Sequence, residues 1–214
     1  MKLKKFTIFG ERHTGTKYLK KILQNNLDLD FTNEYGHKHP FIEGIEPRGL
    51  INTTTDLEKT KSIFDSDDTW FFVTVRNPFD WIGAMYNKPY AMKEFNKENI
   101  FSFMKSKYIA YEYEQPVHNL WKKKKEEPYY FMEEADNILQ LRNLKNQHFY
   151  NLRNFVKKYS IIRLEHFQKD IEKELNKVIN FFDYRKPVNY NLNNEEISFI
   201  KNNLDNDIDN LYYL

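Results

Sequence analysis

The sequence predicts an α/β fold of three layers, in which helices flank a central, mainly parallel sheet. Three observations indicate it. A short apolar and β-branched segment near the N-terminus is followed by a Gly-bounded polar turn and a helical pattern, which is how a βαβ unit begins. Residues 70–75 are almost continuously apolar, as in a parallel strand covered on both faces. Residues 159–164 form a further apolar segment before another helical pattern.

Composition limits the class of protein. The 214 residues suffice for one sizeable core, and no repeat or linker divides them, so we expect residues 1–214 to form a single domain. A net charge of +2 argues against a protein that coats nucleic acid. Aromatic residues make up 17% of the chain, which argues against disorder. The absence of Cys excludes disulfide and thiolate metal sites.

No apolar run reaches 18 residues, and no signal-peptide pattern begins the chain. We therefore expect a soluble, cytoplasmic protein without a membrane partner.

The first half of the chain begins with a strand over residues 3–9 and a turn over 11–15. Apolar residues at 18, 19, 22 and 23 then predict a helix. Gly and Pro residues make 25–49 loop-like, with a short strand near 34–39. A capping-box pattern predicts a helix over 55–64.

The second half begins with the strand at 70–75. Pro78 then favours the first turn of a helix, where its missing N–H costs little. The further predicted elements are helical segments over 97–126 and 133–158, a strand over 159–164, and helices over 165–182 and 194–204.

The turn over residues 10–17 (the 10–17 turn) is a candidate anion site. It joins a strand to a helix, so free backbone N–H groups and the positive helix end point at one place. Gly15 allows close approach of an anion, Thr14 and Thr16 add hydroxyls, and Arg12, His13 and Lys17 add charge or a donor. It is not a Walker A sequence, because no hydroxyl residue follows Lys17. The alternative is a tight βα turn with surface charges.

Arg76 is the second candidate, because it directly follows the buried strand at 70–75. Ligands of parallel sheets collect at the carboxyl ends of the strands. A guanidinium there can bind a second phosphate through forked hydrogen bonds. The alternative is an ion pair with Asp80 at the start of the next helix.

Taken together, these segments resemble a family. Glu11-Arg12-His13-Thr14-Gly15-Thr16-Lys17-Tyr18-Leu19 is similar to the 5′-phosphosulfate loop of sulfotransferases that use 3′-phosphoadenosine 5′-phosphosulfate (PAPS). Val75-Arg76-Asn77-Pro78-Phe79-Asp80-Trp81 is similar to their 3′-phosphate segment. Ile162-Arg163-Leu164-Glu165-His166-Phe167 resembles a later strand-to-helix segment of the same family. The matches occur in the family's order.

The resemblance implies a P-loop-like α/β fold and transfer of sulfuryl from PAPS, as co-substrate, to a hydroxyl or amine of a small molecule or glycan. It implies that PAPS contacts Arg12, His13, Thr14, Gly15, Thr16, Lys17, Tyr18 and Arg76. His13 stands where the family usually has Lys or Arg, and Ala84 stands where it usually has a Ser for the 3′-phosphate. Tyr18 falls where many members place an aromatic against adenine, although a core Tyr is the alternative.

Catalysis of this kind needs preorganised positive charge and a base, and no metal. Arg12, His13 and Lys17 are the candidates for stabilising the leaving phosphate. His39 is the first candidate for the base and Glu34 the second, while a structural His39 is the alternative. The resemblance also points to Arg185 and Lys186 for the 3′-phosphate.

Two other functions stay open from the sequence. One is a P-loop kinase that uses ATP and Mg²⁺, and the other is a non-catalytic module that binds a phosphonucleotide or a glycan. An acceptor cleft could be lined by aromatic residues, for which core packing is the alternative: Trp81, Tyr86, Tyr90, Tyr108 and Trp121.

Overall fold

The computed structural model describes residues 3–35, 62, 64–89, 92–110, 134–166, 192–205, 207 and 209. Its central sheet has four parallel strands in the order β2-β1-β3-β7. The strands are β1 (Lys5–Gly10), β2 (Asp30–Phe31), β3 (Thr69–Val75) and β7 (Tyr159–Arg163). The predicted α/β class with a parallel central sheet is therefore confirmed.

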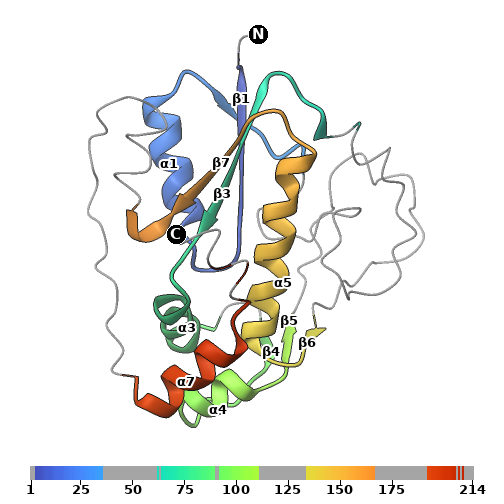
Figure 1. Ribbon diagram of the computed structural model, residues 1–214. Helices are drawn as coiled ribbons and strands as arrows, with labels where there is room; N and C mark the ends of the chain where they lie inside the picture. Colours follow the sequence, from blue (N-terminus) through green and yellow to red (C-terminus); the bar gives the residue numbers. More distant parts are fainter. Residues whose placement is uncertain are drawn as a thin grey trace, which may run out of the picture.

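Helices cover both faces of this sheet (Figure 1), with α1 (Thr16–Asn26) on one side and α5 (Ile138–Asn151) on the other. Side chains alternate between the faces along each strand. Phe6, Ile8 and Phe72 pack toward α1, whereas Phe9 and Val73 pack toward α5; each set belongs to its own buried cluster. The seven residues of β3 are all buried, as the continuous apolar run predicted.

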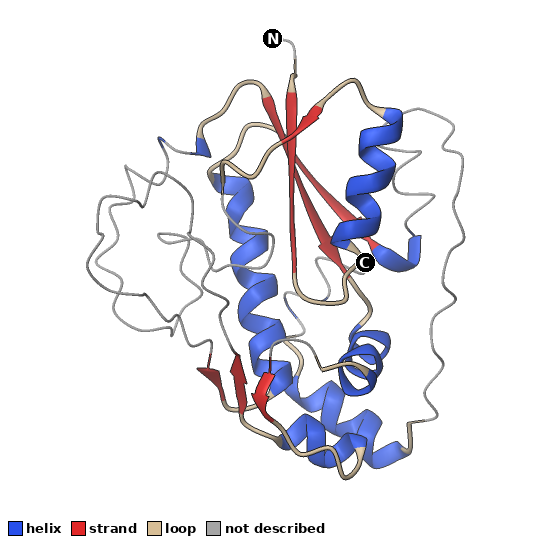
Figure 2. Cartoon of the chain, turned by 180° about the vertical axis from the view of Figure 1, so that it is seen from behind, coloured by secondary structure: helices blue, strands red, loops and turns tan. Residues whose placement is uncertain are grey.

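A second region lies beyond the carboxyl ends of the strands (Figures 1 and 2). It holds α3 (Pro78–Asn87), α4 (Ile100–Lys105), α7 (Asn194–Asn203) and a small antiparallel sheet. The strands of that sheet are β4 (Met92–Glu94), β5 (Tyr108–Ala110) and β6 (Glu134–Ala135). Trp81, Phe103, Tyr108, Leu139 and Ile200 are fully buried in its core.

Several predicted elements are confirmed. The strands at 3–9, 70–75 and 159–164 correspond to β1, β3 and β7, and the helical pattern after the turn is α1. Pro78 occupies the first turn of α3, behind an Asn77 cap whose side chain accepts from the Phe79 N–H. The last predicted helix is α7, and a capping box closes its N-terminus at Asn193.

Other predicted elements differ. The predicted helix over 97–126 is wrong at residues 108–110. These residues pair with β4 and β6 and form β5, the central strand of the small sheet. The strand β2 at Asp30–Phe31 was not predicted, and residues 34 and 35, the described part of the strand expected near 34–39, form a turn. Within 133–158 the structure has β6, α5 and the short 3₁₀ helix η1 (Leu152–Asn154). Residues 164–166 form a 3₁₀ turn, η2 (Leu164–His166), in place of an α-helical start.

The predicted segments at 36–39, 55–61, 111–126 and 167–182 lie outside the described residues. None of the helices in the described ranges is long and apolar enough to span a lipid bilayer.

Candidate functional site

Three segments that the sequence singled out lie at one edge of the central sheet. The 10–17 turn follows β1, Arg76 follows β3 and Glu165 follows β7. These strands are parallel neighbours, with Gly10 opposite Thr74 and Val75 opposite Arg163. Their carboxyl ends therefore meet at the same edge, where ligands of parallel sheets bind.

The 10–17 turn is closed by hydrogen bonds between two of its own residues. The Thr14 N–H and hydroxyl both donate to the Glu11 carbonyl, at 3.3 and 2.6 Å. His13 and Gly15 adopt left-handed conformations, with φ of 61° and 90°. The closed turn ends at Gly15, which delivers the chain directly into α1.

The N-terminus of α1 is suited to an anion. Gly15 is its cap residue and offers no side-chain acceptor, and the first turn carries no acidic residue. The first N–H groups of a helix have no intrahelical partner, so they favour a negatively charged ligand. Thr16 is buried at this position and Lys17 is exposed.

Arg76 reaches this turn directly. Its Nη1 donates to the His13 carbonyl oxygen at 3.2 Å, and its side chain is half-buried. No ion pair between Arg76 and Asp80 is seen in the described part of the chain. The two anion-binding candidates are therefore adjacent, and the Arg76–Asp80 alternative is not what the structure contains.

The side chain of Arg12 is buried and ion-paired. Its Nη1 forms an ion pair with Glu11 Oε1 at 2.8 Å, with both side chains buried. Its guanidinium also lies 5.9 Å from the centre of the Tyr108 ring. Burial opposes ionisation of Glu11, but the charges of Arg12 and Lys145 outweigh it and lower the pKa of Glu11. Contact between Arg12 and PAPS stays a prediction.

His13 is linked to the end of α3. Its Nε2 lies 2.8 Å from the Lys88 carbonyl oxygen. Burial lowers the pKa of His13, and the positive charges of Arg76 and Lys88 lower it further, which outweighs the opposing effects of the Lys88 carbonyl and Glu11. The imidazole is therefore held in its neutral form at neutral pH.

Neither Tyr18 nor Ala84 is fully buried. Tyr18 packs against the apolar cluster between α1 and the sheet. This contact is the core packing that the sequence allowed, and a contact with adenine stays a prediction. Ala84 lies within α3, one turn before Lys88.

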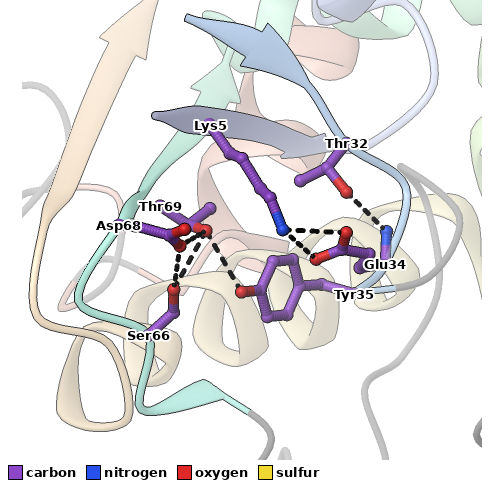
Figure 3. Close-up of polar contacts among 7 residues, drawn as sticks. All are labelled: Lys5, Thr32, Glu34, Tyr35, Ser66, Asp68 and Thr69. Carbon is purple, nitrogen blue, oxygen red and sulfur yellow. Dashed lines mark hydrogen bonds and ion pairs between the residues drawn. The ribbon is translucent and has the colours of Figure 1, made fainter. Parts of the chain in front are cut away.

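Of the two candidate bases, Glu34 lies at the wrong end of the sheet. Both of its carboxylate oxygens accept from Lys5 Nζ, at 3.0 and 3.1 Å, where β1 begins (Figure 3). The Tyr35 hydroxyl beside it lies 3.2 Å from Thr69 Oγ1, at the first residue of β3. Since β1 carries the chain about 16 Å from Lys5 to the 10–17 turn, Glu34 does not face the site. His39, Arg185 and Lys186 lie outside the described residues.

Sequence reasoning missed two buried cations on α5. Arg142 pairs with Asp209 through two hydrogen bonds of 2.7 and 2.9 Å, and its Nη2 also donates to the Arg76 carbonyl at 3.3 Å. Lys145, with 0% exposure, is one of the charges that lower the pKa of Glu11. The available signal was their spacing of three residues with Phe149 four further on, which puts both on a core face.

Two of the aromatic residues considered for an acceptor cleft are core residues. Trp81 is buried and donates from Nε1 to the Arg12 carbonyl at 2.7 Å. Tyr108 is buried beside Arg12. Tyr86 packs edge-on against Phe103, and Tyr90 and Trp121 lie outside the described residues.

Comparisons with protein-family models, curated proteins and solved structures found no match to this chain. Among the described residues, no group of three or more His, Asp or Glu side chains could hold a metal ion. The geometry itself combines an uncapped helix start, a half-buried guanidinium and a neutral imidazole at one sheet edge. Such an arrangement can bind an anion and accept a proton.

Proposed function

We propose that this protein is a sulfotransferase that moves sulfuryl from PAPS to a hydroxyl or amine of a small-molecule or glycan acceptor. The observation that carries the proposal is the hydrogen bond from Arg76 to the His13 carbonyl. It supports one continuous site for a nucleotide with phosphates at two positions. The three segments that resemble the sulfotransferase family also share this edge of the sheet. A P-loop-like architecture is part of the proposal.

Charge is distributed in a way that suits the reaction. PAPS supplies an activated sulfuryl group whose transfer leaves negative charge on the 5′-phosphate. The N–H groups at the start of α1 and the exposed Lys17 lie where they can stabilise that charge. Arg76, half-buried beside the turn, is the residue that we expect to bind the 3′-phosphate. Positioning and charge stabilisation suffice for much of the rate in transfers of this kind.

A thermal-shift experiment without Mg²⁺ tests the proposal. Adenosine 3′,5′-bisphosphate should raise the melting temperature of the full chain in a concentration-dependent way, because a ligand that binds only the folded state stabilises it. Arg76→Ala should weaken this effect at least tenfold in ligand concentration. Arg153→Ala is the matched control. It removes an exposed Arg from η1, which precedes β7 in the chain.

The other candidate functions give different results. Stabilisation by ATP only with Mg²⁺ would favour a P-loop kinase and contradict the proposal. Stabilisation by the bisphosphate nucleotide without sulfuryl transfer to any acceptor, water included, would favour a binding module. If adenosine 3′,5′-bisphosphate stabilised Arg76→Ala and Arg153→Ala equally, Arg76 would not be part of the nucleotide site.

A further inference from the structure

The ring of His13 is fixed in one tautomer. Its Nε2 lies 2.8 Å from the Lys88 carbonyl oxygen, and a carbonyl oxygen only accepts hydrogen bonds. Nε2 must therefore carry the proton. In a neutral imidazole the other nitrogen, Nδ1, then has a lone pair and can only accept.

The surroundings of His13 keep the ring neutral. Its backbone carbonyl accepts from Arg76 at the end of β3, and its ring reaches the end of α3 at Lys88. Burial lowers the pKa of the ring, and the charges of Arg76 and Lys88 lower it further, which outweighs the opposing effects of the Lys88 carbonyl and of Glu11 within the turn. The position that holds Lys or Arg in the similar family is here occupied by a group held uncharged.

His13 lies within the 10–17 turn at the point where this turn meets Arg76. It lies two residues before Gly15, which caps α1, and its own carbonyl receives the Arg76 guanidinium. Its left-handed backbone, with φ of 61°, turns the chain at this residue. A nucleotide bound at both segments would pass beside this residue, so we expect its sulfuryl group to come near the ring of His13.

We propose that His13, held as the Nε2–H tautomer by the Lys88 carbonyl, is the catalytic base whose Nδ1 takes the proton from the acceptor. This inference rests on the proposed sulfotransferase function. In the step, the acceptor O–H or N–H gives its proton to Nδ1, and its oxygen or nitrogen forms the new bond to sulfur. The bond from sulfur to the 5′-phosphate oxygen breaks, and its electron pair leaves on adenosine 3′,5′-bisphosphate. The His13 proton then passes to solvent.

The first test needs no substrate. In a chain labelled with ¹⁵N-histidine, ring spectra at neutral pH should show His13 protonated on Nε2 and unprotonated on Nδ1. His13→Gln identifies its signals by their loss. A ring protonated on Nδ1 alone, or on both nitrogens at neutral pH, would overturn the inference.

The second test measures release of adenosine 3′,5′-bisphosphate from PAPS with water as the acceptor. His13→Gln keeps a donor that can reach the Lys88 carbonyl but has no basic nitrogen. His13→Asn adopts a left-handed backbone readily but is too short to reach Lys88. Both variants should slow release by about 100-fold or more, which is the usual contribution of a general base. Arg153→Gln, at an exposed position in η1, is the control and should release nucleotide normally.

The outcomes separate the inference from the proposed function. If His13→Gln keeps wild-type release while His13→Asn loses it, His13 only anchors the turn and the inference is wrong. Wild-type chain that binds the bisphosphate nucleotide but releases none from PAPS indicates a binding module, so the proposed function fails and the inference fails with it. If the wild-type chain fails to bind the nucleotide, the proposed function itself fails.

Discussion

The hydroxyl oxygens of Thr14 and Thr74 lie 2.8 Å apart, in a buried hydrogen bond that joins the 10–17 turn to β3. Thr14 also donates to the Glu11 carbonyl at 2.6 Å, so Thr74 is the donor between the two hydroxyls if Thr14 keeps that bond. The contact holds the turn against the neighbouring strand at the place where Arg76 follows. It couples the shape of the anion site to the core of the sheet.

Gly10→Ala should disrupt this contact. A Cβ at residue 10 would lie 2.2 Å from Thr74 Oγ1, 2.7 Å from Thr14 Oγ1 and 2.7 Å from the Thr74 carbonyl oxygen. One of these is a backbone atom, so the strands must move, and overpacking of this kind costs about 1–3 kcal/mol. Urea unfolding of the variant should show the loss. An unchanged midpoint would contradict the close approach at Gly10.

We expect Glu165, which follows β7, to stabilise the segment that follows β3. Its Oε1 accepts from the Asn77 N–H at 2.6 Å. Glu165→Ala leaves this part-buried N–H without that acceptor and should cost about 1–3 kcal/mol in free energy of unfolding. Glu165→Gln retains an acceptor oxygen and should recover much of the loss. Equal losses in both variants would mean that the carboxylate charge, and not the hydrogen bond, matters.

Trp81→Phe should weaken the 10–17 turn without emptying the core. The indole Nε1 donates to the Arg12 carbonyl at 2.7 Å, and a Phe ring fills much of the same buried space without a donor. We expect a loss of about 1–3 kcal/mol in unfolding free energy and weaker stabilisation by adenosine 3′,5′-bisphosphate. Trp70→Phe, which removes an indole donor to Ser160 within the sheet, is the control for nucleotide binding. A nucleotide response equal to wild type would separate Trp81 from the site.

Local signals in the sequence were enough to predict three of the four strands of the central sheet, and the turn after β1. The apolar segment 70–75, Pro78 and the Gly-bounded turn each specify their conformation through neighbouring residues, and β3, α3 and the 10–17 turn follow them. The edge that Arg76 shares with the turn follows from parallel strand pairing alone.

What the sequence did not reveal depends on contacts between distant residues. The strand at 108–110 exists because β4 and β6 flank it, and its own residues lie in a charged, helix-like stretch. Glu34 belongs to the opposite edge because it pairs with Lys5, 29 positions earlier. The burial of Arg12 beside Glu11 and Tyr108 depends on β5 as well. Composition and spacing carry no record of such pairings.

The ion pair between Arg142 and Asp209 should be important for stability. Both side chains are buried, and Arg142 also donates to the Arg76 carbonyl. Asp209→Asn leaves the guanidinium without its counter-charge and should cost about 3–5 kcal/mol, as for other broken buried pairs. The double variant Arg142→Met, Asp209→Leu should be more stable than Asp209→Asn, because no buried charge is left unpaired. Unfolding by urea measures all three chains, and a double variant no better than the single one would contradict this account.

Glu11→Gln should lower stability most at neutral pH and least in acid. Burial opposes ionisation of Glu11, but Arg12 and Lys145 lower its pKa below the ordinary value of 4.5. A carboxyl group with a lowered pKa in the folded state contributes its full stabilisation above its ordinary pKa. That stabilisation is lost as the pH falls through the lower, folded value. The variant lacks the charge at every pH, so its deficit in unfolding free energy should be constant from pH 7 to about pH 5 and should shrink below pH 4.5. Glu98→Gln, at an exposed position before α4, is the control and should track wild type. A deficit that stays the same between pH 7 and pH 3.5, measured by urea unfolding, would mean that the ionised carboxylate does not stabilise the buried cations, and that the turn holds Arg12 by its shape alone.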